Sequence, residues 1–290
     1  MKHKEFTVNG GHRLMASYAG PEEGVPVVLL HGGGQTRHAW GKAVTALAHA
    51  GYRAYSIDLR GHGESAWSEA GEYALEHYRD DLRGVVEQIG RPPVLVGASL
   101  GGMVCLLAAG EAPVIATPCL VLVDVTARLS KKGVEYIVGF MNGTMGGFDS
   151  LEEAGKAVAK YLPHREAPKD LSGLRKNLRE RADGRLYWHW DPATQRGGSE
   201  EEFEKISLRM EAAVRHVAAP TLILRGGKSE LVTREGAHEF AGLFKSGEVI
   251  EIDNAHHMVA GDRNDPFSQA LIDFIRLNTA PQSSGIVLQK

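Results

Sequence analysis

The segment Gly97-Ala98-Ser99-Leu100-Gly101 holds a serine with a glycine two residues away on each side. An apolar stretch precedes the segment and a helix-forming stretch follows it, which is the order expected where a strand turns directly into a helix. A serine on such a turn has a strained backbone, and the glycine positions must lack bulk so that strand and helix can approach. The spacing predicts that Ser99 is a nucleophile and that the Leu100 N–H points at an oxygen of the substrate.

A dinucleotide-binding loop is the competing interpretation, because Gly97 and Gly102 fit the first and last glycines of Gly-x-Gly-x-x-Gly. Ser99 then occupies the middle position, where a missing side chain lets the pyrophosphate approach. The segment also follows about the fifth predicted strand, not the first. We therefore favour the nucleophile.

A second glycine-rich segment, His31-Gly32-Gly33-Gly34, follows the apolar residues 25–30. Glycines leave backbone N–H groups uncovered, which suits the stabilisation of a tetrahedral oxyanion. Because this loop and Ser99 both follow parallel strands, we expect them at the same edge of the sheet. Gly33 is the first candidate for an oxyanion donor, and Gly34 is the next.

A serine hydroxyl needs a base to remove its proton and a third group to orient that base. Of the 13 histidines, His256 and His257 follow a late predicted strand, residues 248–252, and so return to the same edge of the sheet. Adjacent loop residues point in different directions, so one of the two is expected to act. No pair of histidines has the His-Glu-x-x-His spacing of a zinc helix.

Two carboxylates compete for the orienting position. Glu230 lies in the loop after the predicted strand 221–224, and Asp124 lies at the end of the predicted strand 120–125. A longer Glu reaches a fixed imidazole more easily, so the sequence favours Glu230, with Asp124 as the alternative. The polar residues 58–65 are predicted to be structural, with turn glycines and a local network of ion pairs or hydrogen bonds.

Short apolar segments alternate with amphipathic ones, a pattern typical of a largely parallel sheet with helices on both faces. The predicted strands are residues 25–30, 52–59, 93–96, 120–125, 221–224 and 249–252, after a short β-meander at the N-terminus. The predicted helices are residues 40–50, 75–89, 103–109 and 267–277.

The alternation stops after Val125 and resumes at Thr221. We expect residues 1–125 and 219–278 to form the core, 126–218 to form a helical cap, and 279–290 to be a disordered tail. Predicted cap helices are residues 151–162, 171–182 and 200–217, and candidates for lining a pocket are Phe140, Met141, Trp188 and Trp190.

The composition limits the partners. The 290 residues are 43% hydrophobic and 24% charged with a formal net charge of −3, which argues against nucleic acid or an anionic membrane as the partner. No apolar run approaches the ~20 residues of a membrane span, so we expect a cytoplasmic protein.

Cys105 and Cys119 lie in apolar segments and imply neither a disulfide nor a metal site. The oligomeric state is open, a homodimer included.

The motifs together resemble the α/β-hydrolase superfamily, in particular its non-haem haloperoxidase, lactonase and esterase branch. The resemblance rests on the segments His31-Gly32-Gly33-Gly34, Asp58-Leu59-Arg60-Gly61-His62-Gly63-x-Ser65, Gly97-x-Ser99-x-Gly101-Gly102, Arg225-Gly226-Gly227-x-Ser229-Glu230 and His257-Met258-Val259. It implies Ser99 as the nucleophile, Leu100 and Gly33 as oxyanion donors, Glu230 as the acid and His257 as the base. The sequence differs from the family in having Glu230 where Asp is usual and His256 where Gly is common.

The expected fold is α/β, with a mostly parallel, doubly wound sheet of about eight strands and a helical cap. The expected activity is that of a cofactor-free serine hydrolase that cleaves a small carboxylic ester or lactone through an acyl-enzyme. Three alternatives stay open: carbon–carbon bond hydrolysis or perhydrolysis on the same triad, a ligand receptor of the same fold, and a dehydrogenase.

Overall fold

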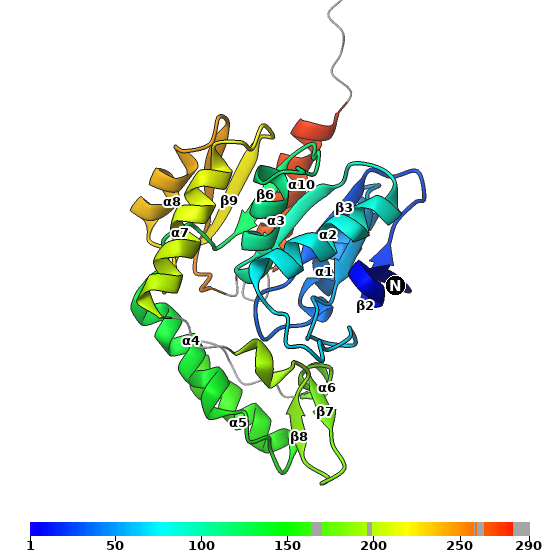
Figure 1. Ribbon diagram of the computed structural model, residues 1–290, viewed down its shortest axis with the longest axis vertical. Coiled ribbons are helices and arrows are strands. Elements are labelled where there is room, and N and C mark those ends of the chain that lie inside the picture. Colours follow the sequence, from blue (N-terminus) through cyan, green and yellow to red (C-terminus); the bar gives the residue numbers. More distant parts are fainter. Residues whose placement is uncertain (164–169, 196–198, 258, 260–263, 281–290) are drawn as a thin grey trace, which may run out of the picture.

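The computed structural model describes residues 1–163, 170–195, 199–257, 259 and 264–280. Its main body is an eight-stranded sheet in the order β1-β2-β4-β3-β5-β6-β9-β10, parallel from β4 to β10 and closed at one edge by the antiparallel β1–β2 hairpin (Figure 1). The strands are β1 (Lys2–Val8), β2 (His12–Ala19), β3 (Pro26–Leu30), β4 (Arg53–Ile57), β5 (Val94–Ala98), β6 (Leu120–Val123), β9 (Thr221–Gly226) and β10 (Gly247–Ile252). The predicted parallel sheet of about eight strands is confirmed.

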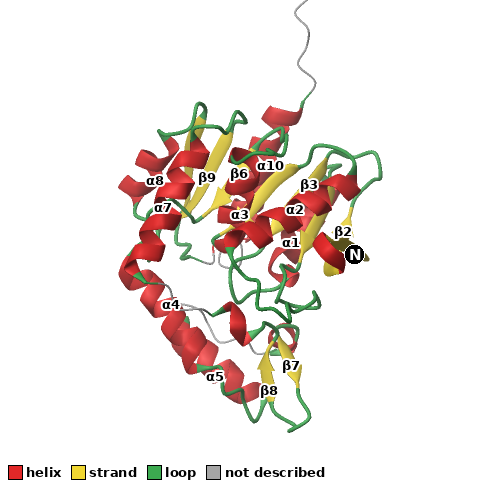
Figure 2. Ribbon diagram, viewed as in Figure 1, coloured by secondary structure: helices red, strands yellow, loops and turns green. Residues whose placement is uncertain are grey.

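Helices cover both faces of the sheet (Figure 2). Alternate residues of the buried strands point to opposite faces, so that Val28 and Leu30 join one hydrophobic core while Val27 and Leu29 join the other. The first core contains side chains of α2 (Leu75–Ile89), α3 (Leu100–Gly110), α7 (Glu200–Val214) and α8 (Arg234–Ala241); the second contains those of α1 (Gly41–His49) and α10 (Asn264–Thr279). This double cover explains why the central strands read as continuous apolar runs.

Between β6 and β9 the chain forms a separate lobe, drawn in the lower half of Figure 1. Its elements are α4 (Lys131–Gly143), α5 (Leu151–Tyr161), α6 (Ser172–Arg175), β7 (Leu178–Glu180) and β8 (Leu186–Trp188). They share a small hydrophobic core that includes Met141, Phe148, Leu178 and Trp188. The lobe lies within the predicted cap.

The prediction of a helix over residues 171–182 is wrong, because only Ser172–Arg175 is helical and β7 follows. β7 and β8 pair as an antiparallel hairpin, and its turn includes Gly184 with φ of +76°. Asp183-Gly184 is a strong hairpin-turn signal, but the charged residues around it obscure the two short strands. The sequence prediction also lacks α4 and α8.

Helix α7 packs on the core although it lies inside the predicted cap segment. A Cβ atom added to Gly110, at the end of α3, would stand 2.3 Å from the Ala213 carbonyl oxygen of α7. On the surface, the Arg209 guanidinium of α7 binds Glu111 with its Nε at 2.6 Å from the carboxylate. The close approach fixes α7 against α3.

The last helix, α10, includes Thr279, the first residue of the predicted tail, and residues 281–290 lie outside the described residues. Among the helices that are described, none has both the length and the apolar character needed to cross a membrane.

The turn around Ser99 predicts a steric penalty at Gly97. A Cβ on Gly97 would stand 2.2 Å from the Gly101 carbonyl oxygen, so Gly97→Ala should lower the free energy of unfolding by about 3 kcal/mol. Gly139, inside α4, is the matched control, because a Cβ there meets no atom within 4 Å. Gly139→Ala should leave stability unchanged or raise it by up to about 1 kcal/mol. Urea unfolding of both variants checks this, and equal stabilities would contradict it.

Candidate active site

Ser99 occupies the turn between β5 and α3, with φ of 46° and ψ of −115°. A non-glycine residue with positive φ is strained, and the surrounding packing must hold it there. Gly97 and Gly101 allow that packing, since a Cβ on Gly101 would stand 2.4 Å from the Leu30 carbonyl oxygen. The Ser99 N–H also donates to the Val123 carbonyl oxygen of β6 at 3.2 Å. The sharp strand-to-helix turn expected from the glycine spacing is therefore present.

Asp124 is the residue directly after β6, the strand next to β5. Ala98 and Val123 are register partners, so Ser99 and Asp124 emerge side by side at the carboxyl edge of the sheet. Asp124 also has positive φ, at 49°. Its carboxylate is fully buried.

Three donors satisfy that buried carboxylate. The Nδ1 atom of His257 lies 2.7 Å from Oδ2 of Asp124, the Ser229 hydroxyl donates to the same oxygen at 2.5 Å, and the Gly226 N–H donates to Oδ1 at 3.0 Å. A carboxylate on Nδ1 fixes the imidazole as the Nδ1–H tautomer, which leaves its other nitrogen, Nε2, as an acceptor. In this tautomer, Nε2 of His257 can take up a proton.

The structure corrects the expectation that Glu230 contacts His257. Glu230 instead contacts Nδ1 of the neighbouring His256, and its side chain is 48% exposed. The reason is the turn after β9, in which the Ser229 N–H donates to the Gly226 carbonyl oxygen at 2.9 Å. The turn brings the Ser229 hydroxyl to Asp124 while Glu230 stays at the surface.

Sequence reasoning missed the role of Ser229. Its hydroxyl donates to Asp124 and accepts the N–H groups of Leu231 and Val232 at 3.2 and 3.1 Å. The available signal was its position just beyond a strand that ends at the carboxyl edge, where a serine can close a turn by bonding to the backbone.

The glycine loop after β3 lies beside Ser99. A Cβ on Gly32 would stand 3.4 Å from the Ser99 Cβ, and one on Gly33 would stand 4.0 Å from Cδ2 of Leu100. The Gly32 N–H donates to Oε1 of Gln35 at 3.1 Å, and the Gly34 N–H donates to Nε2 of His62 at 3.2 Å. Within the described part of the chain the Gly33 N–H has no acceptor. Gly33 thus keeps the N–H that an oxyanion donor needs.

Two buried histidines flank this loop, with ring centroids 5.1 Å apart. The Nε2 atom of His31 accepts the Leu59 N–H at 3.0 Å, and its Nδ1 lies 2.8 Å from the Gly32 carbonyl oxygen. Burial lowers the pKa of His31 to about 4 and that of His62 to about 3. Both rings are therefore neutral near pH 7 and act as structural acceptors.

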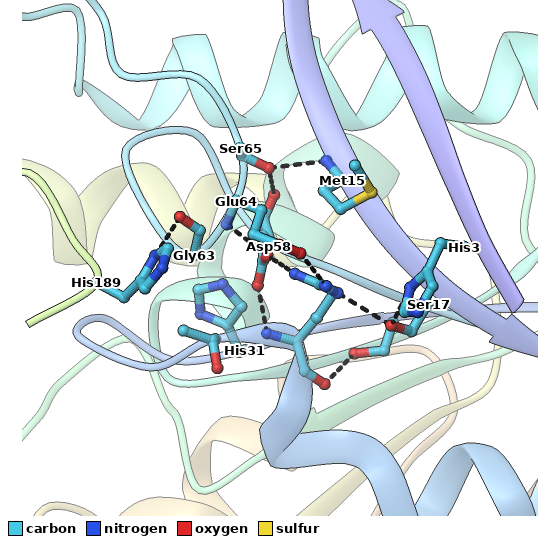
Figure 3. A network of polar contacts seen from close by, with 12 residues as sticks. His3, Met15, Ser17, His31, Asp58, Gly63, Glu64, Ser65 and His189 are labelled. Atoms are coloured by element: carbon cyan, nitrogen blue, oxygen red, sulfur yellow. Dashed lines mark hydrogen bonds and ion pairs between the residues drawn. The ribbon is translucent and has the colours of Figure 1, made fainter. Parts of the chain in front are cut away.

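The polar loop 58–65 forms the predicted network (Figure 3). The buried Asp58 carboxylate accepts the backbone N–H groups of Arg37 at 2.6 Å and Glu64 at 2.9 Å, and it also contacts the Arg37 guanidinium. The Ser65 hydroxyl donates to the Asp58 carbonyl oxygen at 2.6 Å and accepts the Met15 N–H at 2.9 Å. The loop is thereby fixed to β2 and to Arg37, which follows the glycine loop.

The β7–β8 hairpin continues into residues that dock on the same loop. The Gly63 N–H donates to the His189 carbonyl oxygen at 2.6 Å, and the Asp191 N–H donates to the Gly61 carbonyl oxygen at 2.7 Å. Figure 3 shows the His189 ring directed at the carbonyl oxygen of Gly63. The phenol of Tyr73 donates to Asp191 at 2.6 Å.

All four candidate pocket residues belong to the core of the lobe or pack against it, and the ring centroids of Phe140 and Trp188 lie 6.0 Å apart. Met141 and Trp190 also reach the glycine loop, since a Cβ on Gly34 would stand 2.7 Å from Cε of Met141 and 3.8 Å from Nε1 of Trp190. These two residues therefore cover the loop beside Ser99.

Comparison with known proteins gives consistent matches. The profile of a family described as "Alpha/beta hydrolase family" matches residues 27–270. The chain is 29% identical over 260 residues to the esterase Rv0045c of Mycobacterium tuberculosis, covering 86% of this chain and 81% of that protein. It is also 29% identical over 259 residues to the sn-1-specific diacylglycerol lipase ABHD11 of Mus musculus, covering 86% and 80% of the two chains.

Solved structures agree in fold. The structure of E-2-(acetamidomethylene)succinate hydrolase matches with a TM-score of 0.80 at 22% identity, covering 94% of this chain and 98% of that chain. The structure of Rv0045c matches with a TM-score of 0.70 at 27% identity, covering 95% and 90%. The first likeness concerns the fold alone.

The buried histidines predict that acid destabilises the protein. The pKa values of His31 and His62 lie below the 6.5 of the unfolded chain, so below pH 6.5 the unfolded state binds more protons. The free energy of unfolding should fall as the pH drops from 6.5 towards 4, by about 2 kcal/mol per histidine at pH 5. Urea unfolding at pH 7.5 and 5.0 measures this loss. His62→Gln should lose less stability over that interval than the wild type, and an equal loss would contradict the assignment.

Proposed function

The chain belongs to the α/β-hydrolase family, and we propose that within it the protein is a serine hydrolase that cleaves a small carboxylic ester or lactone through an acyl-enzyme. The relatives named above are an esterase and a lipase, in line with a hydrolase of this fold. The observation that carries the finer proposal is the hydrogen bond from His257 to the buried Asp124, beside the strained Ser99. No step of the proposed reaction requires a cofactor.

The proposed reaction begins when the Ser99 hydroxyl oxygen attacks the ester carbonyl and Nε2 of His257 takes the hydroxyl proton. The N–H groups of Leu100 and Gly33 donate to the oxyanion of the tetrahedral intermediate. His257 then gives the proton to the leaving alkoxide oxygen, and the carbon–oxygen bond of the ester breaks. Water, deprotonated by His257, attacks the acyl-enzyme. The bond between the acyl carbon and the Ser99 oxygen then breaks, and His257 returns its proton to that oxygen as the carboxylic acid leaves.

Asp124 supports this cycle by stabilising the imidazolium that forms when His257 carries the proton. Its own position is set by the Ser229 hydroxyl and the Gly226 N–H, so it cannot turn away from the imidazole without losing both bonds. Asp124 therefore takes the role that the sequence assigned to Glu230.

The substrate pocket is proposed to lie under Met141 and Trp190. Both side chains are almost fully buried and stand against Gly34 of the oxyanion loop. An apolar thioether and an indole exclude water from the reacting carbonyl and favour an apolar acyl or alcohol group.

Removal of the nucleophile tests the proposal directly. Ser99→Ala should lower the kcat for p-nitrophenyl ester hydrolysis by at least about 10⁴-fold, because the acyl-enzyme cannot form. A fluorophosphonate probe should add one label to the wild type, and peptide mass spectrometry should locate that label on Ser99. Turnover by Ser99→Ala at the wild-type rate would refute the mechanism. Activity on a vinylogous diketone but on no ester or lactone would instead favour the carbon–carbon hydrolase.

The two carboxylates give a matched pair of variants. Asp124→Asn should lower kcat by about 10⁴-fold, because an amide cannot stabilise the imidazolium and disfavours the required tautomer. Glu230→Gln should change kcat by less than about fivefold, since a half-exposed ion pair contributes at most about 1 kcal/mol. Steady-state kinetics and thermal unfolding of both variants check this. The reverse order of losses, in folded variants, would return the role to Glu230.

A further inference from the structure

His62 lies between the lobe and the glycine loop, residues 32–34, which holds the proposed oxyanion donor Gly33. The reaction proposed above does not use His62. Its side chain is buried, and its Nε2 accepts the Gly34 N–H at 3.2 Å. Its backbone forms an isolated β-bridge with Trp190 of the lobe. The residue thus contacts both the glycine loop and the lobe.

The glycine loop, residues 32–34, needs such contacts because glycine loses more backbone conformational entropy on folding than any other residue type. The Gln35 side chain holds the loop at the Gly32 N–H, and the His62 ring holds it at the Gly34 N–H. These two acceptors occupy the N–H groups on either side of Gly33. They therefore decide which N–H of the loop remains available to a substrate.

The His62 ring is itself firmly placed. Its Nδ1 lies 2.9 Å from the Arg60 carbonyl oxygen, so the Nδ1–H donates there and Nε2 is left to accept. The Arg60 guanidinium is fixed by Asp81, with both of its nitrogen–oxygen contacts at 2.6 Å. The buried ion pair between Arg60 and Asp81 in the core therefore helps to fix the position of the His62 ring.

The lobe is joined to the same short segment. Two backbone hydrogen bonds flank His62, one from the Gly63 N–H to His189 and one from Asp191 to the Gly61 carbonyl oxygen. They give the segment a strand-like pairing with the lobe, centred on the bridge between His62 and Trp190. His62 therefore both pairs with the lobe and holds the glycine loop.

We propose that His62 is a positioning residue of the oxyanion hole: by accepting the Gly34 N–H, it holds the loop with the Gly33 N–H directed at the substrate oxygen. The proposal rests on the proposed function. It requires a neutral acceptor at the position of Nε2, and the low pKa of the buried ring meets that requirement. An acceptor of similar reach is expected to substitute for the ring, while an apolar side chain is not.

Three variants separate the hydrogen bond from packing. His62→Gln places an amide oxygen where it can accept the Gly34 N–H, His62→Asn has an amide too short to reach it, and His62→Leu has no acceptor. His12→Leu is the control, because His12 contacts the Ala66 carbonyl oxygen beyond the same loop and not the glycines. Kinetics with a p-nitrophenyl ester at pH 7.5, inhibition by a trifluoromethyl ketone that forms a tetrahedral adduct, and thermal unfolding are measured for each.

The expected result is a split between kcat and KM. His62→Leu and His62→Asn should lower kcat by about 10- to 100-fold, part of the loss seen when an oxyanion donor is removed, with KM within about threefold of wild type. The inhibition constant of the ketone should rise in parallel with the loss of kcat. His62→Gln should stay within about fivefold of wild type in kcat, and His12→Leu should match wild type.

Each other outcome overturns the positioning role. If folded His62→Leu or His62→Asn keeps the wild-type kcat, or if KM rises while kcat holds, His62 does not set the oxyanion hole. If His62→Leu does not fold, the Gln and Asn pair decides, and equal kcat values in that pair refute the proposal. Ser99→Ala in the same assay distinguishes the two levels: wild-type activity there refutes the proposed function, whereas its loss alongside unaffected His62 variants refutes only this inference.

Discussion

The site depends on a buried carboxylate that must be satisfied. An ionised carboxylate removed from water loses far more free energy than one hydrogen bond returns, so Asp124 requires several donors at once. The chain supplies them from three places: the end of β9, the turn after it and the loop after β10. Each donor orders its own segment around the same oxygen atoms. The imidazole of His257 is positioned because the carboxylate cannot be left unsatisfied.

A second constraint is backbone strain at neighbouring strand ends. Ser99 and Asp124 both have positive φ, although neither is a glycine, and they follow register partners on adjacent strands. Strained residues persist only where the surrounding packing fixes them. Here the close approach of Gly97 to Gly101 and the hydrogen bond from Ser99 to β6 provide that packing. The sheet therefore places the Ser99 and Asp124 backbones side by side, whatever contacts their side chains make.

The sequence predicts the parts of this arrangement that follow from spacing and from topology. Glycines two residues from Ser99 signal the sharp turn, and the carboxyl ends of parallel strands must share one edge, which places His257 and the glycine loop near Ser99. The choice between Asp124 and Glu230 does not follow from such rules, because β6 and β9 are neighbours and both residues lie beyond strand ends. It depends on the φ angle of Asp124 and on the path of the turn through Ser229, neither of which is encoded in a local pattern. The β7–β8 hairpin was missed for a related reason, since strands of only three residues show too little alternation to be distinguished from other structure, and β7 also carries the charged Arg179 and Glu180.

The two adjacent histidines show how burial gives one residue type two different environments. His256 and His257 each contact a carboxylate through Nδ1, yet the partner of His256 is 48% exposed at its side chain and the partner of His257 is fully buried. Water screens the charge of Glu230 and stabilises the carboxylate without the imidazole, so the contact with His256 is a weak one. Asp124 is shielded from water, so its 2.7 Å hydrogen bond with Nδ1 of His257 lies in a medium of lower polarity, where a hydrogen bond is stronger. The two histidines therefore differ in the burial of the carboxylate that each contacts, and not in residue type. In the proposed reaction, that difference makes His257 the base.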